Sequence, residues 1–266
     1  EIGMRRYWIS RVHFQVFTQH PDLEIISRPR RDDGVERLNP HDDKDPWSFK
    51  VKAGVDRVVF GMPGWRLGYT NDALNSYFVF RTLKEKGILP GHIRFQVSLP
   101  MVNSTVAVRT FPTPGDLEKV RPGYTDCLRA EVEMICAKIP HHELAIQWDL
   151  AREITEINGG IPGVPQEGAI ERNLEQVRLL SPHIPEGVEL GYHFCFGTIG
   201  GWPRFPPKDL GETVKFSNAV VEASGRPVNW VHIPLLDTFD DAFVAPLAQL
   251  KPKGARVYLG AVHNME

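Results

Sequence analysis

The chain has 266 residues, of which 42% are apolar and 24% are charged, a composition typical of a globular domain with a sizeable core. Its net charge of -2 gives no electrostatic basis for binding nucleic acid or an anionic membrane, and it contains no run of about 18 apolar residues that would predict a membrane span. Three cysteines are too few for a disulfide framework and no secretory signal is visible, so we expect a cytoplasmic protein with neither nucleic acid nor membrane as partner.

The two ends of the chain indicate a segment of a longer protein. The sequence opens at Glu1 without an initiator methionine and stops at Glu266, just after an apolar run. Near the start, residues 28–50 are rich in arginine and aspartate. Such a charged stretch predicts an exposed loop insertion and not a core element.

From residue 55 onward, strand-like segments alternate with segments of helical spacing. The predicted strands are residues 55–61, 94–100, 144–149, 187–196, 228–235 and 256–263. The predicted helices are residues 71–86, 114–139, 167–180, 209–223 and 240–250, the last of them interrupted by Pro246. Alternation of this kind predicts an α/β fold with parallel strands joined by helical crossovers.

Two architectures fit this alternation: an open doubly wound sheet and a (β/α)8 TIM-type barrel. No Gly-x-Gly-x-x-Gly motif follows a predicted strand, which disfavours a dinucleotide-binding open sheet. Polar side chains gather at the ends of predicted strands, and in a barrel these ends meet at one mouth. They are Asp149, His193, Cys195, His232 and His263. We therefore favour a single TIM-type barrel over residues 1–266, whose first and last strands lie outside this chain or within its irregular termini.

The most chemically suggestive pair is His193 and Cys195. The predicted strand that carries them runs into a glycine-rich loop, and side chains two apart on a strand point to the same side. Imidazole nitrogen and thiolate sulfur are ligands that zinc prefers. Because two ligands do not complete a zinc shell, a buried cysteine beside a core histidine is the alternative interpretation.

Three motifs, in chain order, then resemble one known family. They are Ile146-Gln147-Trp148-Asp149 with Ala151 and Arg152 after it, His193-Phe194-Cys195, and the run Val257-Tyr258-Leu259-Gly260-Ala261-Val262-His263. Together they resemble the catalytic barrel of cobalamin-independent methionine synthase, in the barrel superfamily that also includes uroporphyrinogen decarboxylase. The resemblance covers the chain from about residue 55 to its end.

The resemblance implies a zinc-dependent methyltransferase or alkyltransferase that acts on a small-molecule thiol and an alkyl donor. In that family zinc holds the thiol as thiolate, the nucleophilic form. The resemblance assigns His193 and Cys195 to Zn2+ as metal ligands, and Asp149 to a substrate ammonium or other polar group. It also assigns His263 the catalytic role of supplying a proton to the departing side of the donor.

Departures from the family leave the substrates open. The family's Glu-Pro after the aspartate is Leu150-Ala151 here, so neither homocysteine nor folate is implied. The family's glutamate ligand on the next strand is absent from residues 230–234, where His232 is the alternative ligand. The family's last cysteine ligand belongs to a strand that this sequence does not contain. We interpret Cys127 and Cys136 as buried packing residues.

Two other functional interpretations remain open. The first is a metal-free lyase or decarboxylase of the uroporphyrinogen decarboxylase type, which would depend on Asp149, Arg152 and Arg204 and would not need Cys195. The second is a barrel that binds a ligand without catalysis. The sequence gives no indication of oligomeric state.

Overall fold

The structure is a computed structural model, and it describes residues 16–27, 48–61, 66–197 and 202–262. The chain divides into two compact units. One comprises Glu1–Ser76 with Thr105–Ile135, and the other comprises Tyr77–Ser104 with Cys136–Glu266. Each unit is described here on its own.

The first unit holds a two-stranded antiparallel sheet and parts of two long helices. Strand β1 (Leu23–Ser27) pairs with β2 (Ser48–Val51), and the unit includes the start of α2 (Tyr69–Glu85) and most of α4 (Asp116–Lys138). Its core is a cluster of aromatic rings whose centroids lie 5.3 to 6.1 Å apart. The rings belong to Phe17, Phe49, Phe60, Phe111 and Tyr124.

A buried carboxylate sets where α2 begins. Glu131 accepts hydrogen bonds from the backbone N–H groups of Gly68 and Thr70, at 3.2 and 2.7 Å. It also accepts one from the Thr70 hydroxyl. The first amides of a helix have no partner within the helix, and here a carboxylate from α4 accepts from them.

The strand predicted at residues 55–61 is wrong. Val58 and Phe60 are buried there, but the segment has no ladder partner among the described residues and forms an irregular stretch. The Val58 N–H donates to Lys119 O of α4 instead. Of the loop predicted at residues 28–50, residues 28–47 lie outside the described part of the chain, and the last three belong to β2.

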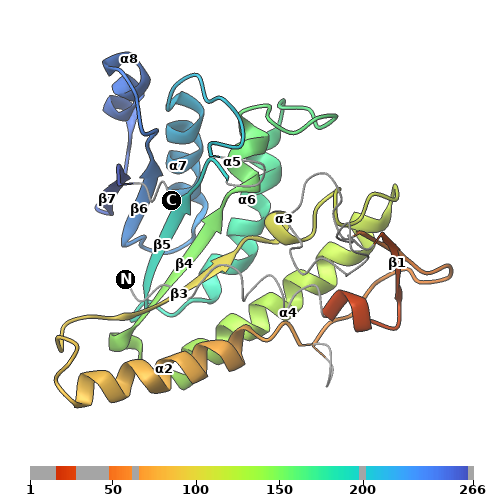
Figure 1. The fold of residues 1–266 in the computed structure, drawn as a ribbon, viewed down its shortest axis with the longest axis horizontal. Helices are drawn as coiled ribbons and strands as arrows, with labels where there is room; N and C mark the ends of the chain where they lie inside the picture. The colour runs from red at the N-terminus through yellow and green to blue at the C-terminus, as the bar shows by residue number, and fades with distance from the viewer. Residues whose placement is uncertain (1–15, 28–47, 62–65, 198–201, 263–266) are drawn as a thin grey trace, which may run out of the picture. The chain divides into compact units, whose positions relative to one another are not determined.

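The second unit is built on a five-stranded parallel sheet, which confirms the α/β class (Figure 1). The strands lie side by side in chain order: β3 (Phe95–Pro100), β4 (Leu144–Leu150), β5 (Glu189–Phe194), β6 (Trp230–Pro234) and β7 (Arg256–Gly260). The helices after them are α3 (Val102–Thr105), α5 (Arg152–Ile157), α6 (Ala169–Leu180), α7 (Gly211–Ala223) and α8 (Asp241–Val244). The unit also holds the rest of α2, the end of α4 and three 3-10 helices, η1 (His141–Glu143), η2 (Ser181–His183) and η3 (Ala245–Gln249).

Most predicted helices are confirmed. Residues 71–86, 114–139, 167–180 and 209–223 correspond to α2, α4, α6 and α7. The segment predicted as one helix at residues 240–250 divides instead into α8 and η3, because Pro246 lacks the N–H that an α-helix would need there. The short helix α5 was not predicted.

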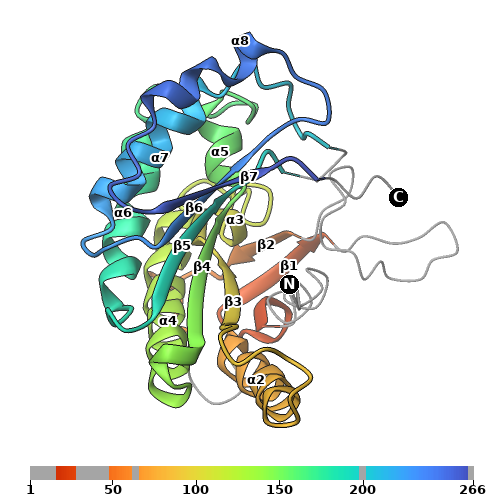
Figure 2. The ribbon, with the colours of Figure 1, turned by 90° about the vertical axis from the view of Figure 1, so that its left-hand side faces the viewer.

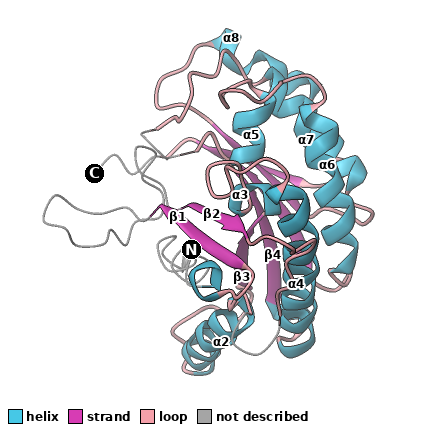
Figure 3. Cartoon of the chain, turned by 90° about the vertical axis from the view of Figure 1, so that its right-hand side faces the viewer, coloured by secondary structure: helices cyan, strands magenta, loops and turns pink. Residues whose placement is uncertain are grey.

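One face of the sheet is covered by helices and forms the core of this unit (Figure 3). The Phe194 ring packs edge-on against Phe216 of α7, with centroids 6.0 Å apart. The Tyr192 hydroxyl lies on the same face and bonds to the hydroxyls of Ser181 and Ser224, at 2.7 and 3.1 Å. Burial raises the pKa of Tyr192 to about 12, so the phenol stays neutral and can donate within this network.

Candidate functional site

The face of the sheet opposite the helices is polar and half-buried. In β3 the buried residues Phe95, Val97 and Leu99 alternate with the half-buried Gln96, Ser98 and Pro100. Strand β4 continues the pattern with Gln147 and Asp149. A parallel sheet usually buries both faces in apolar side chains, so a polar face on such a sheet marks a candidate site.

Three of the predicted site residues lie at one level of this face. The register of the ladder places Asp149 of β4 beside His193 of β5, and His193 beside His232 of β6. Asp149 and His193 stand near the C-terminal ends of their strands, where ligands of parallel α/β sheets bind, and His232 is the middle residue of β6. Asp149 is fixed by the Gln147 amide, which donates to its Oδ1 at 2.8 Å.

His193 and His232 contact each other directly. Their Nδ1 atoms lie 2.6 Å apart, and the rings stack with centroids 4.7 Å apart and planes inclined by 23°. At that distance one Nδ1 carries the proton and donates while the other accepts, so the accepting imidazole, when neutral, carries its own proton on Nε2. Two neutral rings that share this hydrogen bond are therefore different tautomers.

Two glycines allow side chains of a neighbouring strand to lie close to the backbone beside the histidine pair. A Cβ on Gly260 of β7 would lie 2.9 Å from His232 Nε2, so the glycine leaves room for that ring. A Cβ on Gly191 would lie 1.8 Å from Trp230 Cε2, which places the indole over the backbone of β5 one level below His193. The indole is thus an apolar surface on the N-terminal side of the imidazoles.

Cys195 is the first residue after strand β5, which ends at Phe194. The thiol is buried, and its Sγ accepts a hydrogen bond from Gly197 N at 3.3 Å. Its own backbone N–H donates to Leu150 O of β4.

The remaining predicted residues lie elsewhere. His263, the predicted proton donor, falls outside the described residues. Cys127 and Cys136 are buried, and burial raises the pKa of the Cys127 thiol to about 11, which keeps it protonated at neutral pH. Arg204 lies in the segment after β5, where its N–H donates to Phe196 O and Gly197 O.

A buried carboxyl group that the sequence reading missed lies just after β4. Glu153 of α5 is 1% exposed, and its Oε2 accepts a hydrogen bond from Ser104 Oγ at 2.8 Å. Its Oε1 has no hydrogen-bond partner among the described residues. Burial raises the pKa of Glu153 to about 7, against the smaller opposing effects of its own backbone N–H, of the Ser104 bond and of Arg152. The Asp-x-x-x-Glu spacing after a strand was the signal that could have found it.

A second missed feature is the ladder of amides and hydroxyls that leads to Asp149. The amides of Gln96 and Gln147 both donate to Ser98 Oγ, at 3.1 and 3.3 Å. Alternation of polar with apolar residues over 95–99 and 146–149 could have revealed them. The ladder fixes the amide orientations, so it presents a preorganised polar surface beside the histidine pair.

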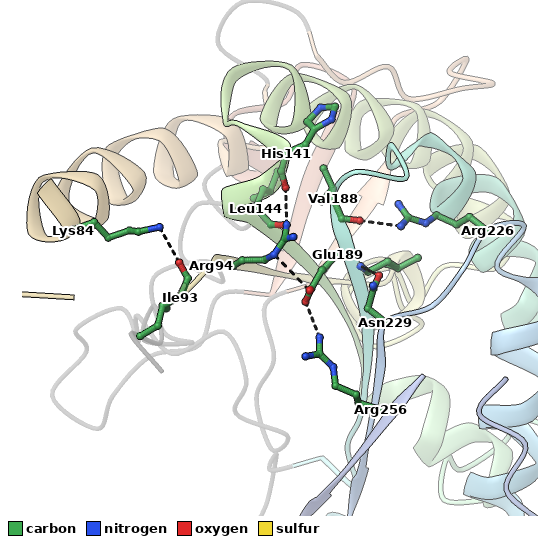
Figure 4. A network of polar contacts seen from close by, with 11 residues as sticks. Lys84, Ile93, Arg94, His141, Leu144, Val188, Glu189, Arg226, Asn229 and Arg256 are labelled. Atoms are coloured by element: carbon green, nitrogen blue, oxygen red, sulfur yellow. Dashed lines mark hydrogen bonds and ion pairs between the residues drawn. The ribbon is translucent and has the colours of Figure 1, made fainter. Parts of the chain in front are cut away.

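Two ion pairs that share Glu189 cross the same face at the N-terminal ends of the strands (Figure 4). Glu189 of β5 forms ion pairs with Arg94, just before β3, and with Arg256 of β7, at 3.5 and 2.9 Å. Arg94 also donates to the backbone carbonyls of His141 and Leu144. These contacts hold the strands at the end remote from the histidines.

Comparison with known proteins adds no assignment. No family model matches the chain, no curated protein matches it, and no solved structure matches it. Among the described residues, no helix is both long enough and apolar enough to cross a membrane. What the fold and the site define is therefore an α/β protein whose parallel sheet carries a polar, histidine-bearing face.

Proposed function

We propose that this chain is a zinc-dependent transferase that moves a methyl or other alkyl group between a donor and a small-molecule thiol. The observation that carries the proposal is the juxtaposition of His193 and His232 on adjacent strands, at the C-terminal side of the polar face and level with Asp149. The proposal extends the sheet to a (β/α)8 barrel, in which this face would line the interior.

The two histidines meet part of the requirement for zinc. Two imidazole nitrogens that share a tetrahedral zinc with bonds of about 2.05 Å lie roughly 3.3 Å apart. The Nδ1 atoms are 2.6 Å apart, so small ring rotations would bring them to that separation and would replace the shared proton. Among the described residues, no group of three or more histidine, cysteine or acidic side chains is assembled for a metal. Cys195, one residue beyond β5, is the third ligand that we propose.

A zinc ion held there would favour the thiolate form of a substrate thiol at neutral pH. The chain's own residues would bind the substrate, exclude water and donate a proton. Asp149, fixed by the Gln147 amide, would accept hydrogen bonds from a polar group of the substrate. The Trp230 indole would exclude water from below the imidazoles. His263 keeps the proposed role of donating a proton to the part of the alkyl donor that departs.

A metal-free lyase is the second candidate, and two observations favour it. The histidines already satisfy each other through one hydrogen bond, and the Cys195 sulfur already accepts one from Gly197 N. In such an enzyme the histidine pair would move protons, Asp149 and Arg152 would bind substrate carboxylates or amines, and Cys195 would be dispensable.

Metal analysis of the purified protein separates the candidates. We expect about one zinc per chain, lost in His193→Ala, in His232→Ala and in Cys195→Ser. The matched controls are the exposed His142→Ala and the buried Cys127→Ser, both of which should keep zinc. Each protein is then incubated with small thiols and with methyl or epoxide donors, and thioether products are identified by mass spectrometry. A protein without zinc and without thioether product would refute the transferase, and unchanged activity of Cys195→Ser would favour the lyase.

A further inference from the structure

Four side chains on the polar face of the sheet have hydrogen-bonding groups that no described residue uses. They are Gln96 and Ser98 of β3, Gln147 of β4 and Trp230 of β6, and we call them the polar row. Strands β3 to β6 lie side by side (Figure 2), and the register places Ser98 beside Gln147. Gly191 of β5 lies between Gln147 and Trp230. Because the ladder fixes these positions, the four side chains share one face whether or not further strands pair with β7.

The hydroxyl group of Ser98 presents a hydrogen-bond donor. Its oxygen accepts from the amides of Gln96 and Gln147, at 3.1 and 3.3 Å. A hydroxyl oxygen has two lone pairs, and these two bonds use both of them. The O–H itself has no acceptor among the described residues. A ligand group beside Ser98 would therefore have to accept a hydrogen bond.

The amide oxygens of Gln96 and Gln147 present hydrogen-bond acceptors. Both side chains are half-buried, and both donate through Nε2, Gln96 to Ser98 and Gln147 to Ser98 and Asp149. These bonds fix which end of each amide is the nitrogen. In the described part of the chain, neither Oε1 receives a hydrogen bond. A ligand group beside either amide oxygen would therefore have to donate one.

The indole of Trp230 adds a second donor. Its Nε1 and Cε2 would lie 2.3 and 1.8 Å from a Cβ on Gly191, so the ring lies over that glycine. Gly191 is the ladder partner of Gln147, which brings the indole to the end of the polar row. Trp230 is only 6% exposed, yet its Nε1–H has no acceptor among the residues that the structure describes. A buried indole N–H usually has a partner, and a bound ligand can supply it.

We infer that the polar row is a subsite for a neutral ligand with several hydroxyl groups, such as a monosaccharide. The unused groups alternate between acceptor and donor along the row, from Gln96 Oε1 and Ser98 O–H to Gln147 Oε1 and Trp230 Nε1–H. A hydroxyl group both accepts and donates, so neighbouring hydroxyls of one ligand can match this alternation. None of the four side chains carries a formal charge, which disfavours an ionic ligand at this position.

The spacing of the row suits one sugar ring. Neighbouring strands lie about 4.8 Å apart, so a single ring can contact two or three of these groups at once. Ser98 and Gln147 lie two residues before Pro100 and Asp149, which puts the row next to the level of His193. If the transferase proposal also holds, the thiol or the alkyl donor carries a sugar-like group. The subsite itself uses no zinc, so it is tested apart from that proposal.

Nuclear magnetic resonance titration tests the subsite directly, because its N–H groups give their own signals. The probes are myo-inositol and D-glucose, added to the isotope-labelled chain. We expect saturable shifts of the Trp230 indole signal and of the Gln96 and Gln147 side-chain amide signals, in the millimolar range typical of such small ligands. Two control signals should not move. They are the indole of Trp148, which alternates to the helix-covered face, and the amide of Gln166, which donates to a backbone carbonyl after α5.

Two variants and one matched ligand test the role of the hydroxyl groups. Gln96→Leu and Ser98→Ala each remove one group of the polar row and should raise the dissociation constant about threefold to tenfold, the contribution of one neutral hydrogen bond. The control Thr82→Val removes a hydroxyl from α2 and should leave the dissociation constant unchanged. Cyclohexanol has a six-membered ring with a single hydroxyl and should bind far more weakly than either probe. Circular dichroism checks that each variant is folded.

An absence of shifts with both probes would overturn the inference. Equal shifts with cyclohexanol would overturn it too, because they would show that the ring and not its hydroxyl groups is bound. Unchanged affinity in both variants would place the ligand elsewhere. The titrations are made on the chain as purified and after treatment with a chelator. Binding of the probes by a chain that never holds zinc would support the subsite and count against the transferase, whereas zinc without probe binding would do the reverse.

Discussion

The buried carboxyl group of Glu153 makes the stability of the protein depend on pH in a direction opposite to that of most acidic residues. A carboxyl whose pKa rises on folding binds its proton more tightly in the folded state. Glu153 has a pKa of about 7 in the folded protein against 4.5 ordinarily, because it is removed from water. Its protonation therefore stabilises the fold fully below about pH 4.5, and that contribution is lost as the pH rises toward 7.

The size of the effect follows from the two pKa values. A difference of about 2.5 between 7 and 4.5 corresponds to about 3 kcal/mol of unfolding free energy lost between pH 4.5 and pH 8. Glu153 is buried, so solvent does not screen this cost. Glu153→Gln keeps the shape and the contact with Ser104 but cannot ionise. Its unfolding free energy should exceed that of the wild-type chain by under about 1 kcal/mol at pH 5 and by about 3 kcal/mol at pH 8.

Urea unfolding at pH 5 and pH 8 measures this difference, because comparison with the variant cancels the groups that titrate in both proteins. The exposed Glu186→Gln is the control and should follow the wild-type pH profile. If the difference between Glu153→Gln and the wild-type chain were the same at both pH values, Glu153 would not change charge in this range and the reasoning from burial would be wrong.

Two further predictions concern the packing of the sheet. Gly191→Ala should lower the unfolding free energy by about 1–3 kcal/mol, because its Cβ would overlap the buried Trp230 ring. The control Gly91→Ala, with no atom within 4 Å of its Cβ, should lower it far less. Equal losses of unfolding free energy in urea would contradict the close approach of Gly191 and Trp230. Tyr192→Phe should cost about 1–2 kcal/mol because it leaves the buried Ser181 and Ser224 hydroxyls without this partner, and a thermal midpoint equal to that of the wild-type chain would argue against the network.

The sequence predicts those elements whose pattern is set locally. Period-2 alternation located β3 and β4, and helical spacing located α6 and α7. The segment at residues 55–61 is also short and apolar, but its Val58 N–H bonds to Lys119 O of α4 and Phe60 packs on Tyr124, distant in sequence, so these contacts take the place of a strand ladder. Short elements such as α5 provide too few residues for a periodic signal.

The candidate site was predicted in part. Strand-end position placed Asp149 and His193 correctly at one level, because the ladder of a parallel sheet continues from strand to strand. The direct contact of His193 with His232 depends on the register between β5 and β6, which no single segment encodes. Cys195 lies one residue beyond the end of β5, where its N–H still donates to Leu150 O of the neighbouring strand, and the contact of its sulfur with Gly197 N belongs to a loop that has no periodic signal.

The two ion pairs of Glu189, with Arg94 and with Arg256, link strands that are not neighbours in the sheet. Each arginine lies two strands away from the glutamate, so the side chains reach over β4 on one side and over β6 on the other. Both ion pairs therefore join strands that share no hydrogen bonds with each other and add cross-links to the ladder at this end of the sheet. Salt screens partly exposed ion pairs, so rising ionic strength would weaken these cross-links and leave the backbone ladder in place.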